Sequence, residues 1–149
     1  RNIHPALYPG AVFLDRDGVI NRDSSEYVKS WAEFEFLPGS LAAIRRLTEA
    51  GRTVIIITNQ SAVGRGMLDI ATLEAMHRRL RQAVDEQGGR IDAIFYCPHH
   101  PDDGCACRKP KPGLILQAQR QYRLGLSAAT MIGDSARDVE CGIRAGCVA

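Results

Sequence analysis

Long hydrophobic runs are missing from this 149-residue chain, whose longest aliphatic block is the four residues Val54–Ile57. A helix that crosses a membrane needs about 20 consecutive apolar residues. The N-terminal stretch also lacks the basic region followed by a long apolar segment that is typical of a secretory signal. We therefore expect no membrane partner, no secretion and a location in the cytoplasm.

An excess of charge of either sign is missing as well. The 19 Lys and Arg residues and the 17 Asp and Glu residues leave a formal net charge of only +2, which gives no reason to expect a nucleic-acid partner. Hydrophobic residues make up 45% of the chain and charged residues 24%, as in soluble globular proteins. We expect one domain over residues 1–149, a monomer, with a C-terminal edge strand missing beyond Ala149.

The cysteines are few, odd in number and unevenly placed. Of the five, Cys97, Cys105 and Cys107 crowd into one segment, while Cys141 and Cys147 stand apart near the end. A disulfide framework needs paired cysteines in an oxidising compartment. The local concentration is more typical of a metal site in a reducing compartment.

Apolar and β-branched runs alternate with helical patterns along the chain. Short buried strands are predicted over residues 11–14, 53–57, 91–96 and 129–132, and helices between residues 38 and 51, 69 and 88, 112 and 123, and 135 and 144. This alternation predicts an α/β fold with a doubly wound, mostly parallel sheet. Ligands of such sheets bind beyond the carboxyl ends of the strands.

The first strand stops on two carboxylates, Asp15 and Asp17, with Gly18 directly behind them. In an extended backbone, residues two apart point to the same side, and two neighbouring carboxylates repel each other unless a cation or a shared proton compensates them. The sequence Asp-Arg-Asp-Gly could also form an ordinary solvated turn. This segment alone leaves both interpretations open.

Polar side chains also follow the other predicted strands. Thr58 and Asn59 end the second strand, Asp134 ends the fourth, and the third leads through its loop to Arg108 and Lys109. Carboxyl ends of parallel strands meet at one edge of a sheet, whereas solvated turns have no reason to gather these groups there. The convergence favours a functional site.

These groups are suited to phosphoryl transfer. Mg²⁺ prefers oxygen ligands and commonly takes one or two carboxylates together with substrate phosphate; Asp15, Asp134 and the main-chain carbonyl of Asp17 could supply protein ligands. Asp15 could act as the nucleophile that forms an aspartyl-phosphate, and Asp17 as the general acid and base. Thr58 and Lys109 could bind the transferring phosphoryl group.

Four segments together resemble the motifs of the haloacid dehalogenase (HAD) phosphatase superfamily, in the same order. They are Asp15-Arg16-Asp17-Gly18, Thr58-Asn59-Gln60, Lys109-Pro110 and Gly133-Asp134-Ser135 through Asp138. The resemblance implies that Asp15 is the nucleophile, Asp17 the general acid and base, and Asp134 a magnesium ligand. It also implies that Thr58 and Lys109 bind the phosphoryl group.

The role of Asp138 stays open at this point. Ser135 and Asp138 have the spacing of a helix capping box. By the resemblance, Asp138 could also act in the outer shell of the metal site, and the two roles are compatible.

A second metal site is predicted in the cysteine-rich loop. Three thiols and one imidazole lie within eleven positions, at Cys97, His99, Cys105 and Cys107. This set fits a closed tetrahedral zinc site, with His100 as an alternative ligand and reduced cysteines without metal as the alternative state. Since four protein ligands leave no open position, the zinc would be structural and would stiffen the loop that carries Arg108 and Lys109.

Zinc loops of this kind occur in the branch of the superfamily that contains the heptose-1,7-bisphosphate 7-phosphatases and the histidinol-phosphate phosphatases. Several segments are more similar to the heptose enzymes: Asp17-Gly18-Val19-Ile20-Asn21, Glu26-Tyr27-Val28, Phe34-Glu35-Phe36, Thr58-Asn59-Gln60-Ser61 through Arg65-Gly66, and Lys109-Pro110-Lys111-Pro112-Gly113. The resemblance implies a phosphorylated-sugar substrate, the heptose 7-phosphate of lipopolysaccharide precursor synthesis, bound by Asn59, Gln60, Ser61 and Arg108. Val19 and Ser24-Ser25 depart from common family forms, which are Thr and His-Gly.

Two further expectations complete the interpretation. No large insertion separates Asp17 from Thr58 or Thr58 from Lys109, so we expect no large cap domain.

The alternative without enzymatic activity is a phospho-acceptor receiver module, which also uses a strand-end Asp, Thr and Lys on a doubly wound sheet. Such a module has no need of a second acid at Asp17 or of a zinc loop.

Overall fold

Four parallel strands form the centre of the molecule, in the order β3-β2-β1-β4. The computed structural model describes residues 10–149. The strands are β1 (Val12–Leu14), β2 (Val54–Asn59), β3 (Ala93–Cys97) and β4 (Thr130–Ile132). Because all neighbouring strands are parallel, their carboxyl ends lie at one edge of the sheet.

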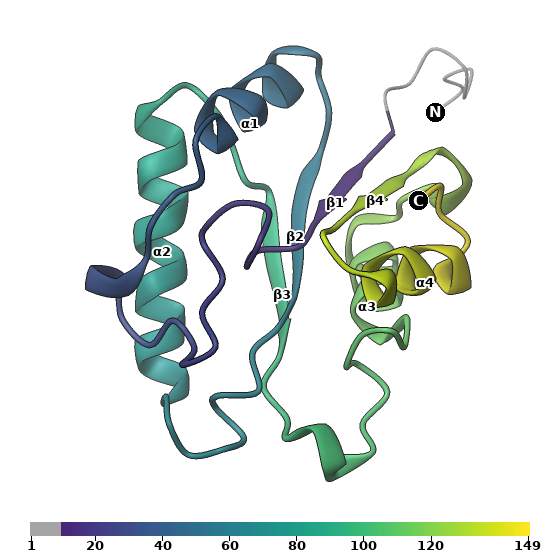
Figure 1. Ribbon diagram of the computed structural model, residues 1–149. Helices are drawn as coiled ribbons and strands as arrows, with labels where there is room; N and C mark the ends of the chain where they lie inside the picture. The colour runs from purple at the N-terminus through teal and green to yellow at the C-terminus, as the bar shows by residue number, and fades with distance from the viewer. Residues whose placement is uncertain (1–9) are drawn as a thin grey trace.

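Helices cover both faces of this sheet (Figure 1). They are α1 (Ser40–Glu49), α2 (Ile70–Glu86), α3 (Gly113–Tyr122) and α4 (Ala136–Ala145). α1 and α2 lie on one side of the sheet, and α3 and α4 lie on the other. The predicted doubly wound α/β fold is therefore confirmed.

The two faces of the sheet bury two separate cores. Phe13, Ile55 and Ile57 pack with Leu114 and other residues on the side of α3 and α4. The strand residues between them, including Val12, Leu14 and Ile56, pack with residues of α1 and α2 such as Ile44 and Leu80. A strand covered on both faces is apolar at every position, which explains why the predicted strands were continuous hydrophobic runs.

β2 extends further than predicted. Thr58 and Asn59 belong to the strand and pair with Tyr96 and Cys97 of β3, whereas the apolar pattern ends at Ile57. Because Thr58 and Asn59 are polar, the hydrophobic pattern ends at Ile57. The backbone hydrogen bonds between strands do not depend on side-chain polarity, so the strand continues for two more residues.

The segment between β1 and α1 forms a folded flap, residues 21–36. Single bridges join Asn21 to Asp17 and to Phe36, and a short 3₁₀ helix spans Trp31–Glu33. The Trp31 ring stacks on Phe34 with 4.9 Å between centroids. In residues 10–149 no inserted segment forms a large cap domain, as predicted. Within that range no helix is long and apolar enough to cross a membrane.

Candidate active site

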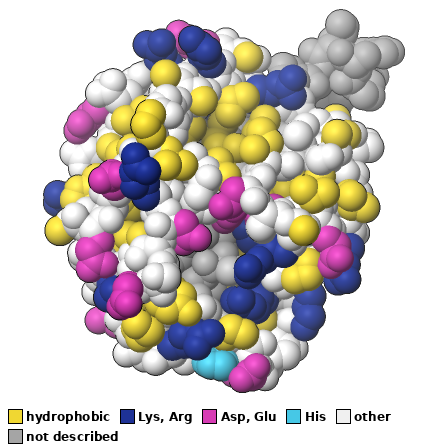
Figure 2. Space-filling model, in the orientation of Figure 1, with side chains coloured by type: hydrophobic (Ala, Val, Ile, Leu, Met, Phe, Trp, Pro, Cys, Tyr) yellow, Lys and Arg dark blue, Asp and Glu magenta, His cyan; other side chains and the backbone are white. Residues whose placement is uncertain are grey.

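A cavity of about 390 Å³ opens at the carboxyl ends of β1, β2 and β4. Figure 2 shows acidic and basic side chains gathered around a hollow on this face. The cavity lining includes Asp15, Asp17, Arg108, Lys109 and Asp134. The structure thus brings together the polar residues that end three strands with the two basic residues that follow the cysteine-rich loop.

A tight turn after β1 positions the two motif carboxylates. The amide of Asp15 still donates to the Ile132 carbonyl of β4 at 3.0 Å, and the Arg16 carbonyl then accepts the amide of Ile20 at 2.8 Å. Gly18 has φ +87, and a Cβ atom at this position would collide with the Asp134 carboxylate. Glycine therefore permits both the turn and the close approach of Asp134.

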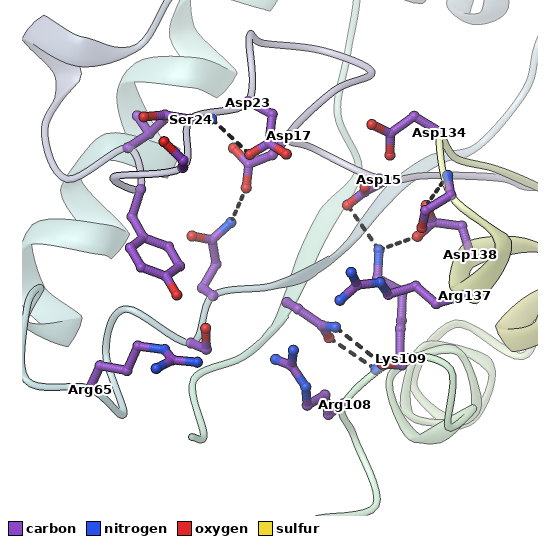
Figure 3. A pocket seen from close by; sticks show the side chains of 17 residues that line it. Asp15, Asp17, Asp23, Ser24, Arg65, Arg108, Lys109, Asp134, Arg137 and Asp138 are labelled. Carbon is purple, nitrogen blue, oxygen red and sulfur yellow. Dashed lines mark hydrogen bonds and ion pairs between the residues drawn. The ribbon is translucent and has the colours of Figure 1, made fainter. Parts of the chain in front are cut away.

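Lys109 joins two buried carboxylates (Figure 3). Its Nζ donates to Asp15 Oδ1 at 2.8 Å, to Asp138 Oδ1 at 2.6 Å and to the Ile57 carbonyl at 3.0 Å. The Lys109 side chain is only 2% exposed, so these three acceptors satisfy all of its donors. Burial raises the pKa of Asp15 to about 6, against the opposing effect of the Lys109 ammonium.

The side chain of Asp17 is held by a different set of groups. Its Oδ1 accepts from Arg16 Nη2 at 2.8 Å, from Arg16 Nε at 3.2 Å and from Asn21 Nδ2 at 2.8 Å. Its Oδ2 accepts from Gln60 Nε2 at 2.9 Å. Asp15 and Asp17 therefore lie on one turn but in different environments, which suits two different chemical roles.

Three carboxylates form a cluster that fits a cation. One oxygen each from Asp15, Asp134 and Asp138 lie within 4.8 Å of one another, and hard oxygen donors of this kind suit Mg²⁺. The carboxylate of Asp17 is outside this group, and the ligand expected from that residue is its main-chain carbonyl. Asp138 enters the cluster through its place on α4.

Asp138 also forms the capping box that its spacing suggested. Its Oδ2 accepts from the Ser135 amide at 3.2 Å and from Ser135 Oγ at 2.9 Å. The other oxygen, Oδ1, accepts from Lys109. The Asp138 carboxylate thus caps the start of α4 and also reaches the carboxylate cluster. Only the capping contact with Ser135 is indicated by residue spacing in the sequence.

The polar residues at the end of β2 make internal contacts. Asn59 Oδ1 accepts from the Lys109 amide at 3.0 Å, and Asn59 Nδ2 donates to the Lys109 carbonyl at 3.3 Å. Thr58 Oγ1 accepts from Gln60 Nε2 at 3.0 Å. Asn59, Gln60 and Ser61 line the cavity. Asn59 therefore fixes the main chain of Lys109, a contact across fifty positions that no local pattern reveals.

The cysteine-rich loop brings together four potential ligands. Atoms of Cys97, His99, Cys105 and Cys107 lie within 4.8 Å of one another. His99 Nδ1 is 3.4 Å from Cys97 Sγ and 3.2 Å from Cys107 Sγ. His100 instead uses its Nδ1 to accept the Asp102 amide at 3.1 Å, capping the 3₁₀ helix Pro101–Asp103. Three sulfurs and one imidazole nitrogen fit a tetrahedral zinc ion.

Several cavity residues were not identified from the sequence. Arg137, at the start of α4, and Asp23, on the flap, line the cavity, and no motif marked either of them. Arg65, which belongs to one of the segments similar to the heptose enzymes, also lines the cavity, and its guanidinium lies 5.8 Å from the Tyr27 ring centroid. Arg108 was expected, and its Nη1 is buried without a hydrogen-bond partner among the described residues. An orphaned buried donor of this kind suits an anionic ligand.

Comparisons with known proteins agree with the fold and the site. A family model for HAD-hydrolase-like proteins matches residues 106–149. The D-glycero-β-D-manno-heptose-1,7-bisphosphate 7-phosphatase of Bordetella bronchiseptica is 52% identical over 136 residues, which are 91% of this chain and 76% of the relative. The enzyme of the same name from Pseudomonas aeruginosa gives the same identity and coverage.

Solved structures give the same result. The crystal structure of the B. bronchiseptica D,D-heptose 1,7-bisphosphate phosphatase, complexed with magnesium and phosphate, has a TM-score of 0.89 at 51% identity and covers 93% of this chain and 77% of that one. A HAD-like phosphatase from Mesorhizobium loti has a TM-score of 0.86 at 33% identity, with 94% and 70% covered. The fold and the strand-end site define a phosphatase of the HAD superfamily. Within that class, the chain belongs to the family of the D-glycero-β-D-manno-heptose-1,7-bisphosphate 7-phosphatases.

Proposed function

We propose that this chain hydrolyses the 7-phosphate of D-glycero-β-D-manno-heptose 1,7-bisphosphate through an aspartyl-phosphate on Asp15. The observation that carries this proposal is the buried Asp15 carboxylate at the end of β1, paired with Lys109 and adjacent to Asp134 and Asp138. The substrate is supported by the 52% identity to enzymes that carry this substrate in their names.

The protein's own residues account for both chemical steps. An oxygen of Asp15 attacks phosphorus, and the bond from phosphorus to the sugar oxygen breaks while Asp17 gives a proton to that oxygen. Asp17 then takes a proton from water, whose oxygen attacks phosphorus and releases phosphate from Asp15. Thr58, at the end of β2, and Lys109 would bind the oxygens of the transferring phosphoryl group. Lys109 would do so by exchanging one of its three present acceptors for a phosphoryl oxygen.

The carboxylate cluster would hold the catalytic magnesium. Asp15, Asp134 and the main-chain carbonyl of Asp17 are the proposed ligands, and Asp138 lies close enough to contribute directly or through water. Bound Mg²⁺ would neutralise charge on the phosphoryl oxygens. A magnesium and phosphate complex of a protein 51% identical to this one supports the assignment.

The cysteine-rich loop would hold a structural zinc. Cys97, His99, Cys105 and Cys107 are the proposed ligands, and the capping contact of His100 with the Asp102 amide favours His99 as the imidazole ligand. Zinc at this position would fix the loop that delivers Arg108 to the cavity. Arg108 would then bind the substrate together with Asn59, Gln60 and Ser61.

A panel of phosphate esters tests the proposal. Phosphate release is measured with both anomers of heptose bisphosphate and with histidinol phosphate, and phosphorus NMR identifies the ester that is cleaved. We expect the 7-ester of the β anomer to be hydrolysed fastest and Asp15→Asn to be inactive. Faster turnover of histidinol phosphate would show that the proposed substrate is wrong. Turnover by the Asp15→Asn variant would overturn the mechanism. A monomeric state, a single domain over 1–149 and a cytoplasmic location remain predictions beside it.

A further inference from the structure

Arg16 is fully buried although it lies between the two motif carboxylates. Its exposed fraction is 0%, and a buried cation needs partners for its charge and its donors. One edge of the guanidinium, Nε and Nη2, donates to Asp17 Oδ1. Its face lies over the Phe34 ring, 5.6 Å from the centroid. The motif therefore carries a third charged side chain, which is not among the residues that line the cavity.

The other edge of the guanidinium is held by α2. Arg16 Nη1 donates to His77 Nε2 at 3.0 Å and contacts Met76 Sδ at 3.6 Å. His77 must accept this bond through an unprotonated nitrogen, so its ring is neutral with the proton on Nδ1. Burial, assisted by the nearby guanidinium, lowers the pKa of His77 to about 3, which agrees with the geometry.

The two oxygens of Asp17 are consequently unequal. Oδ1 accepts three hydrogen bonds, two from Arg16 and one from Asn21, and so has no acceptor capacity left. Within residues 10–149, Oδ2 accepts only from Gln60 and so retains one lone pair. Asp17 lines the cavity, and its side chain is 21% exposed. The oxygen with the free lone pair is the one that can exchange a proton there.

We propose that Arg16, fixed by His77, is the positioning residue that orients the Asp17 carboxylate, with Oδ1 anchored and Oδ2 exchanging the proton. This inference rests on the proposed function, since it assigns a support to the general acid and base. In the first step the proton on Oδ2 passes to the sugar oxygen as the bond to phosphorus breaks. In the second step Oδ2 takes a proton from the attacking water.

Leaving-group dependence separates positioning from general structural damage. A sugar alkoxide must be protonated as it leaves, whereas p-nitrophenolate leaves readily without a proton. kcat/KM covers the steps up to transfer of the phosphoryl group to Asp15, so it reports the acid role alone. General acid catalysis contributes typically 10²–10⁴-fold. A variant whose Asp17 is no longer held in position should lose part of this factor in kcat/KM with the sugar ester and little with the aryl ester.

The test compares His77→Leu, His77→Gln and Leu80→Met with the unaltered enzyme, on heptose bisphosphate and on p-nitrophenyl phosphate. We expect His77→Leu to lose about 10- to 100-fold in kcat/KM with the sugar ester, with KM nearly unchanged, and at most about threefold with the aryl ester. His77→Gln supplies an acceptor for Arg16 and should restore most of the loss. Leu80→Met alters buried packing on the same helix at a residue that offers Arg16 no hydrogen-bond acceptor, and it should change neither value.

Equal losses on both esters, or full activity in His77→Leu, would overturn the proposal, as would a folded His77→Gln no better than His77→Leu. If His77→Leu does not fold, Arg16→Lys gives the same test, because lysine lacks the planar fork that faces Asp17 with one edge and His77 with the other. Failure of the proposed function looks different. In that case the unaltered enzyme would not cleave heptose bisphosphate, or Asp15→Asn would remain active.

Discussion

Replacing the proposed nucleophile should make the magnesium-free protein more stable. Asp15 is 9% exposed, and burial raises its pKa from the ordinary 3.8 to about 6 despite the ion pair with Lys109. Above pH 6 the folded protein therefore holds an ionised carboxylate in a site that disfavours it. Asparagine has the same shape without the charge, and Lys109 keeps Asp138 and the Ile57 carbonyl as acceptors.

The magnitude follows from linkage between proton binding and folding. Between pH 3.8 and 6 the folded state binds the proton of Asp15 more tightly than the unfolded state does, so the stability contributed by this group falls as pH rises through that window. The full difference corresponds to about 3 kcal/mol at pH 7. It is roughly half as large at pH 5 and vanishes below pH 3.8. Asp15→Asn should thus gain about 3 kcal/mol at pH 7 and nothing at pH 3.5.

Urea unfolding at several pH values, in buffer without magnesium, measures this difference. Chains of this length commonly unfold in one cooperative transition, and a gain of about 3 kcal/mol raises the melting temperature by about 6–12 °C. Asp134→Asn is the matched control, because Asp134 is an exposed carboxylate of the same cluster and should change stability by less than about 0.5 kcal/mol. An Asp15→Asn variant that is less stable at pH 7, or whose gain does not depend on pH, would refute the reasoning.

The remaining predictions concern the other charged and metal-binding groups. With p-nitrophenyl phosphate, whose leaving group needs no proton, Asp17→Asn should slow the second step and let the phosphoenzyme on Asp15 accumulate, which mass spectrometry of acid-quenched protein detects; absence of the adduct at reduced turnover would contradict the assigned role. Cys107→Ala should lose zinc and lower the melting temperature by about 4 °C or more, whereas Cys141→Ala, outside the cluster, should retain the metal by elemental analysis. The pKa of His77 is lowered from 6.5 to about 3, so below pH 6.5 the unfolded state binds a proton that the folded state does not, and the free energy of unfolding falls as the pH drops. His77→Gln should remove about 2 kcal/mol of this loss at pH 5. Urea unfolding at pH 5 and pH 7 measures the difference.

The sequence predicted the parallel sheet and most of the groups around the cavity for a physical reason. Strands buried on both faces are continuous apolar runs, and each run stops where the chain reaches the site. Asp15, Thr58 and Asp134 could therefore be identified as strand-end residues, and the shared edge of a parallel sheet brings them together. Neither step requires knowledge of long-range contacts.

The contacts that organise these groups were not predictable in the same way. His77 has the helical spacing of the core residues of α2 and is buried, but nothing local shows that it accepts a hydrogen bond from Arg16, sixty-one positions away. An arginine between two aspartates looks like part of a solvated turn, and only the packing of α2 and Phe34 buries it. Likewise, the capping box marks Asp138, while its bond to Lys109 depends on the position that Asn59 gives to the main chain of Lys109, fifty positions along the chain.

The double hydrogen bond from Asn59 to the main chain of Lys109 has a consequence for how this fold can diversify. Because β2 holds Lys109 directly, the position of this lysine does not depend on the length or composition of the exposed segment 102–104 that precedes it. We therefore expect that residues can be exchanged or inserted there, between the His99 and Cys105 positions, without moving the ammonium that contacts Asp15. The exposed part of the cysteine-rich loop can then change its chemistry in evolution or in design while Lys109 and Asp15 keep their contact.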